Sequence, residues 1–356
     1  MKCRIFLFGF ILCIHLAKAQ EVMVKFQAAK VSLRGLSVVD NEVVWASGSN
    51  GTIIRTTNGG KTFQVIIPKG YEKRDFRDIE AFDSSTAIIM AVDTPAIMLK
   101  TTDGGQTWKK VFEDKRPGMF LDAMDFVGNT GVVVGDPIEG KMFRAYTYDQ
   151  GESWTIDQNA PELSAGEAFF ASSGSNVKWI SSSSASAHPK KLTGEKLIPK
   201  RLTGDKLIFV SGGIRSRMFL GDKSFQIPLQ SGKNSTGANG FAIAPIGKYG
   251  FVCGGDFSEP RRTDSTLVLF EIKNKKVEFT FPATPPSGYK SAVSFVKAYT
   301  LISCGTSGID LSTDNGKNWK KISDLPFHIC NAVYGSGKVW LAGPKGSIAV
   351  FTLAGQ

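Results

Sequence analysis

The chain has 356 residues, of which 42% are hydrophobic, 43 are Lys or Arg and 32 are Asp or Glu. Its formal net charge of +11 is dilute over this length and is typical of a solvated surface. The sequence contains no basic stripe interleaved with aromatic residues, so we do not expect nucleic-acid binding.

Residues 1–19 have the pattern of a secretory signal peptide. Lys2 and Arg4 precede an apolar run, Ile5 to Leu16, that is too short to span a bilayer stably. A small-x-small motif ends at Ala19. We therefore expect an exported protein, periplasmic or secreted, with no transmembrane segment after cleavage; a buried N-terminal helix is the alternative. The cysteines that remain, Cys253, Cys304 and Cys330, are odd in number and are expected to be buried free thiols.

One octapeptide recurs along the chain. TTNGGKTF begins at Thr56, TTDGGQTW at Thr101, TYDQGESW at Thr147 and STDNGKNW at Ser312, and the first three starts are 45 and 46 residues apart. Short runs rich in Val, Ile, Phe and Thr, bounded by Gly, Asn and Asp, indicate three strands before each copy and one after it. A four-stranded unit with a period in the forties predicts a β-propeller.

We expect seven blades within a single domain, residues 20–356. The units begin near Leu33, Phe76, Phe120, Ala165, Gly237, Gly288 and His328. The seventh unit stops after three strands, so the alternating segment Glu21 to Phe26 is predicted to supply its outer strand and close the ring. Six or eight blades are the alternatives, because the fourth and fifth units are irregular. The fourth carries an insertion at about residues 181–206, whose basic part, 190–206, is either a solvated loop or a site for an anionic partner.

The octapeptide has the composition of a tight turn. Its third residue, Asp or Asn, can accept hydrogen bonds from backbone amides two residues on. Its fifth residue, Gly, tolerates a left-handed backbone, and its last, Trp or Phe, can pack between layers. No copy carries more than two carboxylates, too few to build a calcium site, so we expect no metal and no cofactor. The structural positions are Asn58, Gly60, Phe63, Asp103, Gly105, Trp108, Asp149, Gly151, Trp154, Asp314, Gly316 and Trp319.

TTDGGQTW matches the pattern S/T-x-D-x-G-x-T/S-W and so resembles the Asp-box, or bacterial neuraminidase repeat, which lies on the periphery of propellers in known families. The segments DFRDIEAFD, VVVGDPIEG, GEAFFASSGSN, VCGGDFSEP and PPSGYKSAVSFV are similar to those of exported bacterial propellers related to the photosystem II stability and assembly factor family. This resemblance implies a protein that binds protein partners during complex assembly.

Polar residues precede the innermost strands and are predicted to ring one mouth of the central channel. They are Arg34, Arg77 with Asp78, Asp122, Glu167, Asn239, Lys290 with its neighbour Tyr289, and Asn331. One interpretation is that strand starts are simply polar and exposed. The other is a binding rim on a rigid scaffold.

Catalysis would need a pair of carboxylates at a defined separation, as in glycoside hydrolysis. Asp122, Asp136, Glu167 and Asp256 are the candidates, and Arg34, Arg77 and Tyr289 could complete a sialidase-like set. However, no Arg-Ile-Pro segment of the sialidase type precedes the first octapeptide. We therefore predict a non-enzymatic, monomeric scaffold for an unknown protein or an envelope or glycan ligand, with a glycan-active hydrolase as the alternative.

Overall fold

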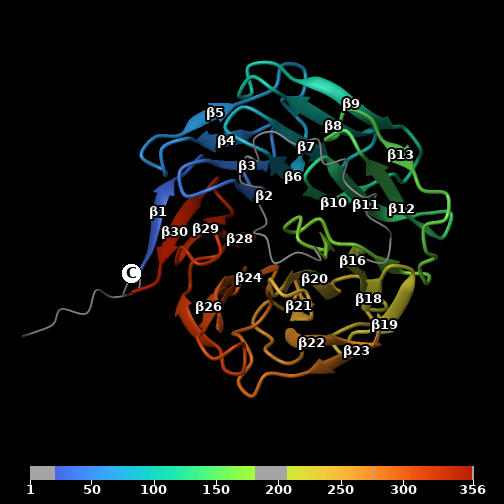
Figure 1. Ribbon diagram of the computed structural model, residues 1–356, viewed down its shortest axis with the longest axis vertical. Coiled ribbons are helices and arrows are strands. Elements are labelled where there is room, and N and C mark those ends of the chain that lie inside the picture. The colour runs from blue at the N-terminus through green and yellow to red at the C-terminus, as the bar shows by residue number, and fades with distance from the viewer. Residues whose placement is uncertain (1–20, 181–206, 275, 355–356) are drawn as a thin grey trace, which may run out of the picture.

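The computed structural model describes residues 21–180, 207–274 and 276–354, and none of these residues is in an α-helix. Seven antiparallel sheets are arranged in a ring (Figure 1). The predicted seven-bladed β-propeller is thereby confirmed. The expected signal peptide, residues 1–19, and the insertion at 181–206 lie outside the described residues, so both stay predictions. No helix in the described ranges is long and apolar enough to cross a membrane.

The first three blades are regular and consecutive in the chain. Blade 1 holds β2 (Leu33–Val38), β3 (Val44–Gly48), β4 (Ile53–Thr56) and β5 (Gln64–Ile66). Blade 2 holds β6 (Phe76–Ala81), β7 (Ala87–Ala91), β8 (Ala96–Thr101) and β9 (Lys109–Asp114). Blade 3 holds β10 (Leu121–Val127), β11 (Thr130–Ile138), β12 (Lys141–Thr147) and β13 (Thr155–Ile156).

The next two blades are less regular. Blade 4 holds β15 (Val177–Trp179), β16 (Leu207–Val210), β18 (Arg217–Leu220) and β19 (Lys223–Gln226). Blade 5 holds β20 (Thr236–Ile243), β21 (Tyr249–Asp256), β22 (Leu267–Lys273) and β23 (Lys276–Thr280). Two short strands, β14 (Glu167–Ala168) and β17 (Gly212–Gly213), extend the sheet of blade 5 beyond its innermost strand.

The last two blades close the ring. Blade 6 holds β24 (Ala292–Lys297), β25 (Thr300–Gly305), β26 (Gly308–Ser312) and β27 (Lys320–Ser323). Blade 7 holds β28 (Ile329–Ala332), β29 (Lys338–Ala342), β30 (Ile348–Thr352) and, as its outer strand, β1 (Val22–Phe26). The pairing of β1 with β30 confirms the predicted closure by the N-terminal segment (Figure 1).

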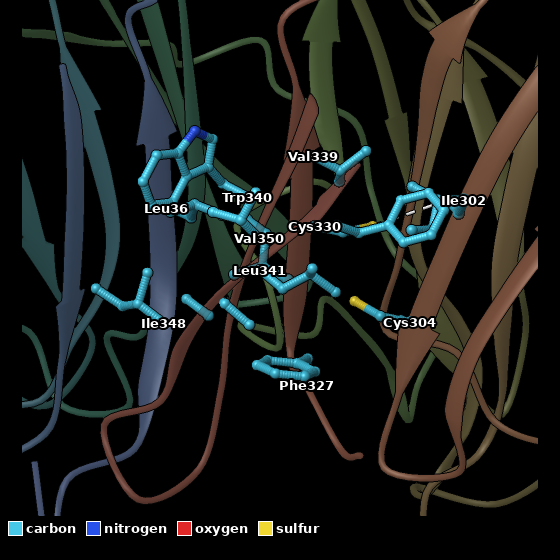
Figure 2. Packing of buried hydrophobic residues seen from close by; sticks show 14 of the residues in the cluster. Leu36, Ile302, Cys304, Phe327, Cys330, Val339, Trp340, Leu341, Ile348 and Val350 are labelled. Carbon is cyan, nitrogen blue, oxygen red and sulfur yellow. Dashed lines mark hydrogen bonds between the residues drawn. The ribbon is translucent and has the colours of Figure 1, made fainter. Parts of the chain in front are cut away.

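Burial explains why the middle strands are apolar without alternation. Both faces of a blade are covered by its neighbours, so every residue of β7 and β8 is buried, and a continuous apolar run is what such a strand requires. Outer strands such as β9 are largely exposed and carry lysines. Figure 2 shows one inter-blade layer, in which Trp340 and Leu341 of blade 7 pack near Leu36 of blade 1 and Ile302 of blade 6. Cys253, Cys304 and Cys330 are buried and free, as predicted.

Each octapeptide forms the turn between the third and fourth strands of its blade. In the second blade Thr101 donates a hydrogen bond to Asp103, and Asp103 accepts one from the amide of Thr107 at 2.9 Å. That amide lies four residues on, so the predicted spacing of two was wrong. Asn58 accepts the equivalent bond from Thr62. The fifth-position glycines all have positive φ, from 74° to 88°.

The last residue of the octapeptide packs between blades. The ring of Trp319, at the end of the blade 6 turn, lies 6.4 Å from the ring of Phe251 in blade 5. Gly316 leaves room for this contact, because a Cβ there would lie 2.2 Å from the Phe251 ring. The motif therefore joins neighbouring blades as well as neighbouring strands.

Candidate functional site

Four predicted rim residues are the extra residues of β-bulges. The pairing of the first and second strands skips Arg34 in blade 1, Arg77 in blade 2, Asp122 in blade 3 and Asn239 in blade 5. A bulge leaves its extra residue out of the ladder and re-aims its side chain. Because every blade repeats the same strand order, these residues lie at the same end of the channel. We call this end, where the innermost strands begin, the upper mouth.

In blades 6 and 7, the residues predicted to precede the innermost strand are not the ones that do so. Ser291 and His328 directly precede β24 and β28, and their amides bond to Cys304 and Ala342 in the second strand. Lys290 precedes the equivalent residue of blade 6, Ser291, by one position, and Asn331 follows that of blade 7, His328, by three positions. His328 is thus a residue of the mouth that the sequence pattern did not single out; its position immediately before the apolar start of the seventh unit was the available signal.

Lys290 and Tyr289 do not lie on an open rim. The Lys290 side chain is 0% exposed, forms a 2.7 Å ion pair with Asp310, and donates to Ser307 and to two backbone carbonyls. Tyr289 is buried and donates to Asn239 at 2.8 Å. Burial raises the pKa of Tyr289. These residues stabilise blades 5 and 6, and the prediction that they line the rim was wrong.

Glu167 also lies elsewhere than predicted. The sequence pattern places the start of the fourth unit near Ala165, but the innermost strand of blade 4 is β15, and Glu167 belongs to the short strand β14. Its carboxylate accepts hydrogen bonds from Arg217 at 2.7 and 2.8 Å and from Ser211 at 2.5 Å. Although burial raises its pKa, these hydrogen bonds hold the pKa of Glu167 below its usual value. It is a structural ion pair.

Asp256 is likewise held by its own partners. Its buried carboxylate accepts hydrogen bonds from the Ser258 hydroxyl at 2.6 Å and amide at 2.9 Å, and forms a 3.4 Å ion pair with Lys233. Although burial raises its pKa, these hydrogen bonds lower the pKa of Asp256 to about 2. A carboxylate this strongly stabilised in its charged form is a poor general acid.

Residues 169–176 form a plug in the upper mouth. They precede β15, and the green segment before β16 reaches toward the middle of the ring in Figure 1. The plug contacts blades on every side: the Phe169 amide donates to Asp136, the Ser172 carbonyl accepts from Arg34, and the Ser173 hydroxyl donates to the carbonyl of Ser291. Its central residues, 171–174, are all buried. In the sequence, this segment is marked only by the similarity of GEAFFASSGSN to segments of exported bacterial propellers.

Below the plug lies Asp78. Its carboxylate accepts hydrogen bonds from the amides of Ile79 and Met124, and Gly174 packs directly on it. Burial raises the pKa of Asp78 to about 7. Asp78 therefore supports the plug from beneath and does not line the open mouth as predicted.

Positive charge gathers over blades 1 and 2, beside His328 of blade 7. Arg34 donates to the Ser172 carbonyl at 3.4 Å, and Arg77 pairs with Asp75 at 2.8 Å. Burial, and then the nearby charge of Arg77, lowers the pKa of Arg34. Burial, followed by the charges of both arginines, lowers the pKa of His328 to about 3. His328 is therefore neutral near pH 7, and we call the two arginines, Arg34 and Arg77, the cationic cluster. Such a group can bind a carboxylate, since guanidinium groups match its geometry.

Two carboxylates lie beside this cluster. Asp122 is 0% exposed, and within the described part of the chain neither of its carboxylate oxygens accepts a well-aligned hydrogen bond. Burial, and then the charge of Asp136, raises the pKa of Asp122 well above its usual value, against the opposing effect of Arg77 and nearby backbone amides. Burial raises the pKa of Asp136 to about 6. Of the four carboxylates considered for catalysis, the structure brings only these two together.

Comparisons with known proteins identify the class of protein by its fold. No protein-family model and no curated protein matches the chain. A structure of YCF48 bound to D1 peptide is similar, with 17% identity, a TM-score of 0.59 and coverage of 94% of this chain and 96% of that one. YCF48 from Cyanidioschyzon merolae has 14% identity, a TM-score of 0.60 and coverage of 93% and 98%. The WD40 β-propeller domain of Doa1 has 11% identity, a TM-score of 0.59 and coverage of 94% and 97%.

These similarities extend over nearly the whole of each chain and define a seven-bladed β-propeller. At identities of 17% or less they concern the fold alone.

Proposed function

We propose that this chain is an exported, non-enzymatic propeller scaffold that binds a segment of a protein partner at its upper mouth, in the course of assembling a complex. The observation that carries the proposal is the cationic cluster. Arg34 and Arg77 lie at bulges on consecutive blades, and Asp75 is the one acidic side chain within salt-bridge distance of either in the described chain. The YCF48 structure with a bound D1 peptide supports a peptide as ligand.

The chemistry of the cluster favours an acidic segment. A carboxylate reaching Arg34 and Arg77 would relieve the repulsion between two partly buried guanidinium groups and gain charge-assisted hydrogen bonds. The plug beneath them closes the channel at this level, so the ligand would lie across the mouth. Both arginines belong to strands of the rigid frame, β2 and β6, which holds them in place for binding.

A double substitution tests this function. Arg34→Ala with Arg77→Ala should lower recovery of partners from a cell-envelope extract by about tenfold or more, because two charged contacts at the centre of an interface are lost. The matched control, Lys276→Ala with Lys320→Ala, removes the same charge from exposed outer strands. It should leave recovery unchanged. Equal recovery by the arginine variant and the wild type would refute a binding role for the cluster.

A glycan-active hydrolase is a second candidate function, because Asp122 and Asp136 lie close together. A carboxyl group with a pKa of about 6, such as Asp136, is suited to donate a proton near neutral pH. If the protein is a hydrolase, wild type should turn over a member of a glycoside panel, and Asp136→Asn should abolish that turnover. A wild-type protein inert on the whole panel rejects this candidate.

A further inference from the structure

A pair of phenylalanines lies on the opposite side of the upper mouth from the cationic cluster. Phe170 belongs to the plug, and Phe257 begins the loop after β21 of blade 5. Their rings meet edge to face, with centroids 6.0 Å apart and an interplanar angle of 86°. Phe257 is 49% exposed and Phe170 is half-buried, so the two rings together present an apolar surface to solvent.

Phe170 is held in place by its surroundings. A Cβ on Gly212, in β17, would lie 2.3 Å from the Phe170 ring, so the ring packs directly on the backbone of that strand. The carbonyl of Phe170 accepts hydrogen bonds from the Ser172 amide at 2.7 Å and from Asn176 at 3.1 Å. An aromatic ring fixed in this way makes a strong anchor, because little conformational entropy is lost when a partner binds.

The plug joins this pair to the cationic cluster. Ser172 donates its amide to the carbonyl of Phe170 and accepts a hydrogen bond from Arg34 on its own carbonyl. One short segment therefore fixes an apolar surface and a guanidinium group in a single frame across the mouth. A ligand lying over the plug would contact both.

Charge at the apolar side favours the same kind of ligand. Arg215 and Arg261 are exposed in the loops that flank the pair, and within the described residues neither forms an ion pair. Lys233 and Arg262 in the same region are each paired with an acidic residue, Glu259 and Asp264. The surface around the phenylalanines thus complements an acidic segment, as the cationic cluster does.

We propose that Phe170 and Phe257 form the second half of the peptide site, and that the bound segment carries an apolar anchor, an aromatic or leucine-like side chain, a few residues from its acidic group. This rests on the proposed function, since it assumes that a peptide segment binds at the upper mouth. It adds the class of sequence that is recognised.

Selection from a display library of random octapeptides tests the two proposals separately. Wild type should enrich peptides with both an acidic and an apolar residue, Phe257→Ala should enrich acidic peptides without the apolar preference, and the double arginine variant should lose the acidic preference. Tyr299→Ala removes a ring that is 66% exposed on the opposite face and should select as wild type does. If Phe257→Ala and wild type enrich the same peptides, the apolar site is rejected and the function stands. No enrichment by wild type rejects both.

A binding cycle with one selected peptide then tests direct contact. Phe257→Ala, or replacement of the peptide's apolar residue by Ser, should each weaken binding about tenfold, the effect of losing a buried apolar anchor. Applied together they should weaken it by little more than tenfold, because both remove the same contact. An additive, roughly hundredfold loss would show that the two groups do not touch and would overturn the proposal. Thermal melting of Phe257→Ala, an exposed-ring variant, verifies that it is folded.

Discussion

At the scale of the residue, the octapeptide turns have the same hydrogen-bond geometry at the third position whether that residue is charged or neutral. Asp103, Asp149 and Asp314 each accept the amide four residues on and the hydroxyl two residues back, and Asn58 does the same without a charge. In the copies that carry Asp, the same hydrogen bonds also stabilise the ionised carboxylate. Hydrogen bonds from the hydroxyl and amide of Thr107 lower the pKa of Asp103 to about 2.

This predicts how substitutions at Asp103 will behave. Asp103→Asn should melt close to the wild-type temperature at pH 7, as the turn at Asn58 implies, whereas Asp103→Ala should melt a few degrees lower because the amide of Thr107 loses its acceptor. Because the folded pKa lies below the unfolded value, the stability that this ionisation contributes is present above about pH 4 and is lost as the pH falls toward 2.

Thermal melts of the three proteins from pH 7 to pH 2 measure both effects. The difference between wild type and Asp103→Asn should shift in favour of Asn as the carboxylate is protonated. A melting temperature for Asp103→Asn that is as low as that of Asp103→Ala at pH 7 would show that the charge itself is required.

At the scale of the element, the plug is the feature that makes this propeller asymmetric. Its central residue, Gly174, has φ of +63°, and a Cβ there would lie 2.2 Å from the Asp78 carboxylate. The plug can therefore pack against β6 only because residue 174 has no side chain. The plug also fixes the position of Phe170 relative to Arg34, through the hydrogen bond from Arg34 to Ser172.

Gly174→Ala should consequently displace the plug. We expect a loss of about 2 kcal/mol or more in the free energy of unfolding, from left-handed backbone strain together with the clash. Gly128→Ala is the matched control, since Gly128 has φ of +61° and a Cβ added there would meet nothing within 4 Å. Urea unfolding of both variants isolates the contact with Asp78; equal losses would mean that the plug does not press on that carboxylate. Faster hydrogen exchange at residues 169–176 should accompany the larger loss.

At the scale of the whole molecule, the repeat was predictable from the sequence and the mouth was only partly so. The octapeptides mark the third turn of blades 1, 2, 3 and 6, and the seven-unit count followed from their spacing. In blade 4, where the octapeptide has decayed, the innermost strand does not begin at the residue that the repeat predicts. Glu167 was therefore aligned with an innermost strand that begins ten residues later, at Val177.

The remaining errors have a local physical cause. In blades 6 and 7 the equivalent residues, Ser291 and His328, lie just before β24 and β28, and the apolar pattern alone does not fix the register to a single residue. Arg34, Arg77 and Asp122 lie at the starts of their strands, each directly after a buried Leu or Phe, although Asp122 is itself buried and does not line an open rim. The plug carried no periodic signal and required the structure.

The ring as a whole depends on β1, since this strand completes blade 7 from the other end of the chain. It pairs with β30 from Val22↔Phe351 to Phe26↔Ile348, and the Phe26 ring lies 5.2 Å from that of Phe63 in blade 1. A chain beginning after Phe26 would leave β30 as an open edge and remove a contact between the first and last blades. We expect it to melt at a lower temperature than a chain beginning at Glu21 and to self-associate in light-scattering measurements, because an unpaired edge is a template for pairing. If the shortened chain remains monomeric with an unchanged melting temperature, closure by the N-terminal strand does not stabilise the ring, and the six complete blades must hold blade 7 through their packing alone.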